Sequence, residues 1–264
     1  MKAHDFGPPD AVNPLEDAAQ LGGEPARIFA FIQICFHFEV NIHDSHCPDD
    51  TIKGMQRAKC HLCETRPPRR ACPALGRDIC GVCCGEHREE SVDCPLDCPH
   101  LREARRHEKP PARDPQTLPH PDIEVTERFL AENEQLVVLA GRLLVVAALQ
   151  TPGAVDSDLR DALDSLARTY RSASSGLIYE SRPANRIAES IVERFQKEMA
   201  DFRERVAERT GVHSIRDQDL LGALVFWQRM EWQGNNGRRK GRAFIDSLVS
   251  LLPPPPQQEN LVTA

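Results

Sequence analysis

The chain has 264 residues, of which 40% are hydrophobic and 5% aromatic, and its formal net charge is −7. This length allows one or two domains, and the apolar content is sufficient for a buried core. The negative charge, without a long block of one sign, argues against a general binder of nucleic acid or other polyanions.

Residues 1–54 are predicted to form a separate N-terminal arm. Four prolines precede the apolar run Ile28–Phe38, which comes late, lacks a signal-peptide cleavage pattern and is too short to span a bilayer. Its partial alternation is typical of a strand. Because the composition changes near Met55, we expect the arm to be dispensable, as an over-extended start or an accessory segment. We expect a cytoplasmic, reducing location and no membrane association.

Residues 55–109 contain a dense group of cysteines. Thiolates are soft ligands, and four of them hold Zn²⁺ without leaving an open position. Two C-x2-C pairs and one C-x3-C pair with loop-like spacers are a strong metal signal. The sequence therefore predicts a double zinc-binding module with two structural Zn²⁺ ions, whose eight ligands are Cys60, Cys63, Cys72, Cys80, Cys83, Cys84, Cys94 and Cys98.

Disulfides and an iron–sulfur cluster are the alternatives to zinc for these cysteines. Disulfides require an oxidising compartment, for which the sequence offers no support. An iron–sulfur cluster is the alternative cofactor, since Cys98 is followed by Pro99, although the closely spaced ferredoxin-type run of cysteines is absent. His87 and His100 are alternative ligands, but eight sulfurs already suffice for two sites. Cys35 and Cys47 lie outside the group and are expected to be ordinary thiols.

The division of the cysteines between the two ions stays open at this point. Modules with four successive ligand pairs usually interleave them. One interleaved arrangement places Cys60, Cys63, Cys83 and Cys84 on one ion, and Cys72, Cys80, Cys94 and Cys98 on the other. Adjacent cysteines are awkward ligands for a single ion, because successive side chains diverge. The alternative places Cys80 with Cys83 on the first ion, and Cys84 with Cys72 on the second.

Residues 60–101 carry a specific series of motifs: C-x2-C, R-x-C-P, I-C-x-x-C-C-G and D-C-P-x-D-C-x-x-L. This series resembles the N-terminal module of a family of uncharacterised bacterial cysteine-rich proteins, and the resemblance extends through the helical region to the segment GRRKGR. It implies a zinc module followed by a helical bundle and supplies no catalytic residue. The present chain departs from the family by its additional N-terminal arm. The spacing is also similar to that of the cross-braced MYND, HIT and B-box modules, which bind proteins.

The rest of the chain is predicted to be helical. Leu101–Lys109 favours a short helix that leaves the metal module, and the five prolines of residues 110–122 indicate an extended linker. Residues 123–252 should form an all-α bundle of about five helices, and residues 253–264 a disordered Pro-rich tail. The expected helices are Ile123–Leu149, a second from about Asp156 with an apolar stripe reaching Leu177 and Ile178, a third from Pro183 to Gly211, Asp217–Trp232 and Gly241–Leu252. The fold is therefore mainly α.

A basic turn near the end of the bundle is the candidate partner surface. The fourth helix is apolar on more faces than a five-helix bundle should cover, and tryptophan and arginine are enriched at binding hot spots. The candidate residues are Trp227, Trp232, Arg238, Arg239, Lys240 and Arg242. The alternative is that both tryptophans are core residues and that the arginines pair with acids of the third helix. Arg66, Arg69 and Arg70 could contact nucleic acid, or could donate hydrogen bonds to zinc-bound thiolates.

These patterns favour a structural-zinc protein that acts as an intracellular interaction or adaptor module with a protein partner. A nucleic-acid-associated regulator and an enzyme with its site in the helical bundle are the alternatives. The sequence contains no P-loop, no G-x-G-x-x-G and no H-E-x-x-H motif. We therefore name no catalytic residue and expect a non-enzymatic role.

Overall fold

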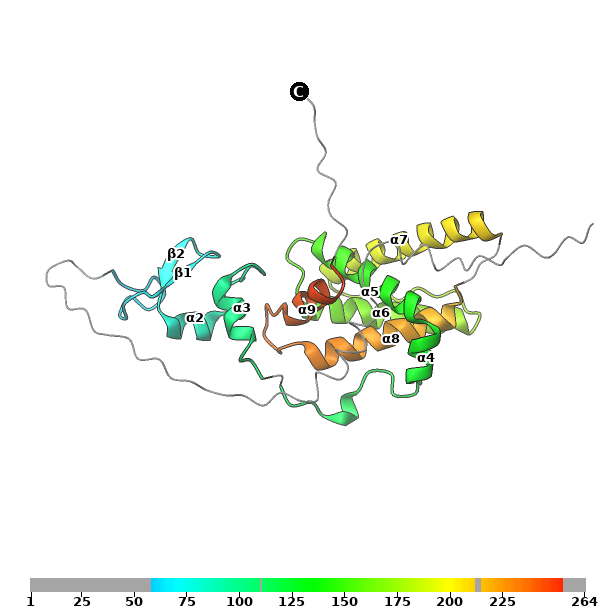
Figure 1. Ribbon diagram of the computed structural model, residues 1–264, viewed down its shortest axis with the longest axis horizontal. Helices are drawn as coiled ribbons and strands as arrows, with labels where there is room; N and C mark the ends of the chain where they lie inside the picture. The colour runs from blue at the N-terminus through cyan, green and yellow to red at the C-terminus, as the bar shows by residue number, and fades with distance from the viewer. Residues whose placement is uncertain (1–57, 110, 212–214, 254–264) are drawn as a thin grey trace, which may run out of the picture.

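The computed structural model describes residues 58–109, 111–211 and 215–253. Figure 1 shows a small cysteine-rich unit at one end of the molecule and a larger group of helices at the other. We call residues 58–109 the metal module and residues 123–252 the bundle. The N-terminal arm, with Cys35 and Cys47, and the tail after Pro253 lie outside the described residues.

The metal module is built around one hairpin and two short helices. Strands β1 (Arg70–Cys72) and β2 (Arg77–Ile79) pair antiparallel, with Cys72 opposite Arg77. Gly76 closes the hairpin at φ 61°, a left-handed conformation that glycine adopts without strain. Helix α2 (Gly81–His87) follows β2 directly, and α3 (Pro99–Arg105) begins at the last cysteine of the module. The short helix expected over Leu101–Lys109 therefore exists, but it begins two residues earlier and ends four residues earlier than expected.

The described residues contain eight α-helices, two in the metal module and six in the bundle, so the expectation of about five bundle helices is wrong. A single turn of 3-10 helix, η2 (Pro115–Thr117), lies between α3 and the bundle helices. None of the described helices is both long and apolar enough to cross a membrane. The bundle helices are α4 (Glu127–Glu132), α5 (Glu134–Leu149), α6 (Asp156–Ser174), α7 (Arg186–Thr210), α8 (Asp217–Gly234) and α9 (Ala243–Leu251).

The extra helix arises because the first expected helix is divided at Asn133. This residue has φ −121° and ψ 21°, outside the helical range, and its side-chain amide donates to the Phe129 carbonyl, which ends α4. Thr126 begins α4 by accepting from the Phe129 amide at 3.1 Å. The break allows the Phe129 ring to lie directly on Gly222 of α8, where any side chain would collide with it.

Helices α5 and α8 form the centre of the bundle. Trp227 is 2% exposed, and its indole nitrogen donates to the Val137 carbonyl at 2.8 Å. Gly141 of α5 leaves room for that indole, because a β-carbon there would lie 2.5 Å from Trp227 Cζ2. Helix α8 is thus enclosed by α5, α6 and α9, with Phe129 of α4 against Gly222. The expectation that α8 leaves apolar faces uncovered is therefore wrong, because the divided first helix supplies an additional element to cover it.

The connection between α6 and α7 differs from the predicted apolar stripe. Helix α6 ends in a Schellman motif: Gly176 has φ 78°, and the Leu177 amide donates to the Ser172 carbonyl at 3.0 Å. Leu177 and Ile178 therefore lie beyond the helix, exposed rather than buried. Helix α7 ends at Gly211, as the sequence predicts, but it begins after Asn185, which caps it, instead of at Pro183.

The proline-rich segment before the bundle is fixed to α8. The Arg229 guanidinium donates to the carbonyls of Pro119, His120 and Ile123, at 3.1, 2.6 and 2.8 Å. Arg113 also donates to the Asn235 carbonyl at 2.5 Å. Since each of these bonds satisfies a backbone carbonyl, the segment follows a defined path along α8 instead of acting as a free spacer.

Candidate metal centre

Four cysteines of the metal module converge on one point. The sulfurs of Cys60, Cys63, Cys80 and Cys83 all lie within 4.8 Å of one another, and three of these side chains are buried. We call this group the first cysteine site. All eight cysteines within the described ranges are free thiols, so no disulfide competes for these sulfurs. The group could hold a metal ion.

Local backbone geometry brings the two C-x2-C pairs together. After the first pair the chain turns sharply at Glu64, which has φ 54° and donates its amide to the Cys60 carbonyl at 2.8 Å. The second pair begins at Cys80, which caps α2 and accepts from the Cys83 amide at 3.4 Å. The Cys80 amide in turn donates to Cys60 Sγ at 3.1 Å, which connects the two pairs. Amide donors of this kind stabilise thiolates.

The pKa values of three thiols of this site, Cys63, Cys80 and Cys83, are shifted in different directions. Hydrogen bonds from the Thr65 side chain and from the Arg66 and Thr65 amides lower the pKa of Cys63 to about 5. The Cys83 amide lowers the pKa of Cys80. Burial raises the pKa of Cys83 to about 12, and the neighbouring thiols contribute. A metal ion at the centre would oppose this penalty, because it stabilises every thiolate at once.

The spacing of the sulfurs fits one ion better than a cluster. With Zn–S bonds of about 2.3 Å, tetrahedral geometry places the sulfurs about 3.8 Å apart. The Sγ atoms of Cys63 and Cys80 are 4.0 Å apart. In a 4Fe–4S cluster each thiolate binds a different iron, and in a 2Fe–2S cluster only two thiolates share an iron, so the four ligand sulfurs of a cluster lie further apart. Of the two arrangements left open by the sequence, the structure brings together the one with Cys80 beside Cys83, and not the one that used both adjacent cysteines.

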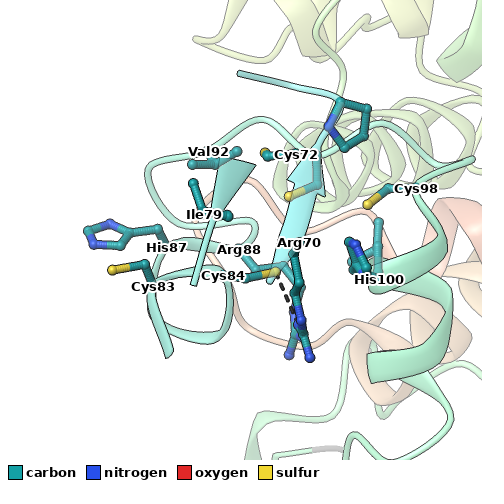
Figure 2. Close-up of a pocket in the computed structure, with 13 residues that line it drawn as sticks. Arg70, Cys72, Ile79, Cys83, Cys84, His87, Arg88, Val92, Cys98 and His100 are labelled. Atoms are coloured by element: carbon teal, nitrogen blue, oxygen red, sulfur yellow. Dashed lines mark hydrogen bonds between the residues drawn. The ribbon is translucent and has the colours of Figure 1, made fainter. Parts of the chain in front are cut away.

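The remaining predicted ligands line a neighbouring cavity. Figure 2 shows Cys72, Cys84, Cys98 and His100 around it, and Cys94 belongs to the same lining. His87 also lines this cavity, and with Glu86 it lies within 4.8 Å of Cys83. Since the first cysteine site already has four sulfurs, neither histidine is needed to complete it. His87 Nδ1 lies 2.8 Å from Ser91 Oγ, which leaves only its other ring nitrogen for a ligand role.

Two of the arginines in the first part of the module face sulfurs. Arg70 donates to Cys84 Sγ at 3.2 Å, and Arg66 Nη1 lies 4.0 Å from Cys80 Sγ. These contacts favour the interpretation that the arginines support thiolates over the one in which they contact nucleic acid. Arg66 and Arg69 are both exposed, whereas Arg70 is half-buried.

Most of the predicted partner surface faces the protein itself. Trp227 is a core residue, so it cannot serve as an exposed anchor in this structure. Trp232 is half-buried and donates to Thr117 Oγ1 at 3.2 Å. Among the four basic residues of the turn, only Arg239 is exposed. The other three, Arg238, Lys240 and Arg242, turn towards the metal module rather than towards acids of the third helix.

The basic turn forms the contact between the bundle and the metal module. Arg238 pairs with Glu108 at 3.1 Å, and Arg242 pairs with Asp93 at 2.8 Å. Lys240 Nζ donates to the Ser91 carbonyl at 3.3 Å. The charges of this turn are thus partly neutralised within the chain, which reduces what they can offer to an external polyanion.

Glu89 lies at the centre of this contact and is fully buried. Its carboxylate accepts from Arg105 at 2.7 Å, from the Asn236 side chain at 2.8 Å and from the Arg242 amide at 3.0 Å. Its carbonyl accepts from the Lys240 amide at 2.6 Å. Arg105 also reaches Asp246 of α9. We call these residues the Glu89 network. Sequence reasoning missed it, because no local pattern pairs residue 89 with residues near 240.

No family model matches the chain, and neither a curated protein nor a solved structure matches it. The resemblance of residues 60–101 to a bacterial cysteine-rich family is therefore not confirmed by these comparisons. What is shown is narrower: four of the cysteines that carry the resemblance lie close enough together to bind a metal ion.

Proposed function

We propose that the protein is a structural-zinc protein that acts as an intracellular interaction module. The observation that carries the zinc assignment is the convergence of four thiol sulfurs within 4.8 Å in a largely buried site. Four thiolates saturate Zn²⁺, so the ion has no position for water or substrate and serves folding instead of chemistry.

The size of the metal module supports a structural role for the ion. Apart from cysteines, its buried apolar cluster contains only Ile79, Val92 and Leu101. Its strands have three residues each and its helices seven. Units this small rarely bury enough apolar surface to fold unaided, and a metal is one of the usual compensations.

Metal analysis of the purified full-length chain tests this assignment. We expect zinc, bound at the first cysteine site, and its loss in the double variant Cys60→Ser with Cys63→Ser. Iron with visible absorbance would instead support the cluster alternative. A chain that folds with neither metal would contradict the proposal, because the metal module would then be stable without the ion that we assign to it.

The interaction role is supported by an exposed apolar segment. Leu177, Ile178 and Tyr179 are consecutive in the α6–α7 connection and are 65%, 105% and 64% exposed. Single exposed apolar residues are common, but a consecutive group is typical of a contact surface. We propose a protein partner at this segment, because the basic turn that was the candidate for nucleic acid is occupied by the metal module.

A site-specific crosslinking experiment separates the partner classes. A photoreactive residue at position 178 should capture protein, and the purified chain should carry little nucleic acid at low salt. Ile178→Asp should abolish the capture, whereas Leu149→Asp, at an exposed apolar position at the end of α5, should not. Copurifying nucleic acid that dissociates with salt would support the regulatory alternative, since counterion release drives such binding.

A further inference from the structure

The four described cysteines outside the first cysteine site share one cavity. Cys72 lies at the end of β1, Cys84 lies on α2, and the other two flank a turn before α3 in which the Cys98 amide donates to the Pro95 carbonyl at 3.0 Å. Cys72, Cys94 and Cys98 are buried, and Cys84 is half-buried. All four line the same cavity.

The chemistry of the cavity wall selects a class of ligand. Its lining offers these four sulfurs and that of Cys83, which also belongs to the first cysteine site, together with the imidazoles of His87 and His100 and two guanidinium groups, but no carboxylate. Hard cations such as Ca²⁺ and Mg²⁺ require oxygen ligands, whereas thiolates select soft or borderline ions such as Zn²⁺. Figure 2 shows the Cys98 sulfur pointing towards the strand that carries Cys72, with Cys84 beside Arg70.

Adjacent Cys83 and Cys84 serve different sides of the same helix. Successive residues of an α-helix point about 100° apart, so one can face the first cysteine site while its neighbour faces the cavity. Cys84 Sγ accepts from Arg70 at 3.2 Å, so a guanidinium is already in place to donate a hydrogen bond to this sulfur when it is metal-bound. In the first cysteine site, Arg66 Nη1 likewise lies 4.0 Å from Cys80 Sγ. Each group of four cysteines thus has one arginine from the same segment of chain.

We propose that Cys72, Cys84, Cys94 and Cys98 form a second metal site, which binds Zn²⁺ and fixes the part of the module that contacts the bundle. This inference rests on the proposed structural-zinc function and assigns the second ion to specific ligands. Arg70 keeps its contact with Cys84 and offsets the excess negative charge of four thiolates around a divalent ion.

The position of this site gives it a role that the first cysteine site does not share. Arg242 of the bundle pairs with Asp93 and donates to the Cys94 carbonyl at 3.4 Å. Lys240 binds the Ser91 carbonyl. The residues that contact the basic turn, Ser91, Asp93 and Cys94, therefore form the segment that ends at this proposed ligand. An ion that holds Cys94 in place holds that surface in place as well.

Metal stoichiometry of matched variants tests the assignment. Native mass spectrometry and elemental analysis of the full chain should give two zinc ions for the wild type. They should give one ion for Cys94→Ser with Cys98→Ser, and one for Cys60→Ser with Cys63→Ser. A wild type with one ion that the Cys94/Cys98 variant retains would overturn the second site and leave the proposed function standing. A folded wild type without metal would overturn both.

A measurement on the wild type decides the case if the variants do not fold. Titration with Co²⁺ should proceed to two equivalents, each with the charge-transfer intensity of four thiolate ligands, and saturation at one equivalent would reject the second site. Cys84→Ser should change the cobalt spectrum, whereas His100→Ala should leave it unchanged. The opposite result would replace Cys84 by His100 as the fourth ligand and reject the assignment as stated.

Hydrogen exchange tests the link to the bundle. Backbone amides of Lys240 and Arg242, which donate to Glu89, should lose protection when Cys94 and Cys98 are replaced by serine. They should retain more protection in the matched Cys60/Cys63 variant. Equal loss in both variants would show that the second ion has no special connection to the basic turn.

Discussion

In the metal module six of the nine buried apolar side chains are cysteines, whereas the bundle buries leucine, isoleucine, valine and aromatic side chains from five of its helices. With zinc bound as we propose, the first region takes from metal–sulfur bonds the stability that the second obtains from the hydrophobic effect. The two regions meet through a third kind of interaction, the buried charges of the Glu89 network. This contrast predicts that each region can be disrupted by a different perturbation.

Chelation should have the largest effect, and only on the metal module. Structural zinc contributes on the order of 10 kcal/mol in small modules, far more than three apolar side chains can replace. A strong chelator should therefore unfold residues 60–98 while most of the far-ultraviolet circular dichroism of the bundle persists. Hydrogen exchange would locate the loss, and added zinc should reverse it. Complete loss of helicity would show that the bundle depends on the module.

Trp227→Ala should produce the reverse pattern. It removes a buried indole and its hydrogen bond to Val137, at an expected loss of about 4 kcal/mol in the free energy of unfolding. Zinc content should not change, because Trp227 packs against Gly141 and bonds to Val137 in the bundle core and is not one of the proposed ligands. Trp232→Ala provides the control, with an expected loss below about 1 kcal/mol at a half-buried site. A loss of zinc in the Trp227 variant would contradict the separation of the two regions.

Glu89→Gln should act on the contact between the regions. Breaking this buried ion pair leaves Arg105 with Asp246 as its remaining acidic partner, so we expect a loss of at most about 3 kcal/mol. We expect two separate unfolding transitions in calorimetry where the wild type shows coupled ones. Arg239→Gln, an exposed residue of the same basic turn, should leave the transitions unchanged. If both variants behave like the wild type, the Glu89 network does not couple the regions.

Gly141→Ala should have the smallest effect and should sharpen the description of the bundle core. The added methyl group would approach Trp227 and Leu252 at 2.5 Å, and overpacking of this kind costs about 1–3 kcal/mol. Alanine regains up to about 1 kcal/mol of helix propensity, so we expect a net loss of about 1 kcal/mol. Thermal unfolding measures it, and Gly85→Ala, where a β-carbon meets nothing within 4 Å, is the control. A stabilised Gly141 variant would contradict the close packing.

The sequence predicted the metal module in outline because ligand spacing is a local property. Two C-x2-C pairs indicate two turns that can share an ion, and the structure joins those pairs at the first cysteine site. The choice between the two ligand arrangements was not predictable, because it depends on which face of α2 carries Cys83. That orientation is set by the hairpin and by Cys80 as the helix cap, and so it depends on the tertiary structure and not on the spacing of the cysteines.

The bundle was predictable wherever one periodic pattern ran between clear stop signals. Helix α7, between Asn185 and Gly211, is the best example. The pattern failed where a local contact overrides periodicity: Asn133 interrupts an otherwise continuous helix, and Gly176 ends α6 before Leu177. The contact of the basic turn with the metal module was also unpredictable, because Arg238 and Glu108 are far apart in the sequence and can pair only after both regions have folded.

The Glu89 network has a consequence for the order in which the chain folds. Glu89 and Arg242 are separated by 153 positions in the sequence, whereas the ligands of the first cysteine site and the turns between neighbouring helices are close along the chain. Closing a long loop costs conformational entropy, and only stable contacts between its ends offset that cost. Local structure therefore forms before residues far apart in the sequence pair. We therefore expect docking of the module on the bundle to be the last and slowest step, and a chain deprived of zinc to stop just before it, with the Glu89 carboxylate still in water.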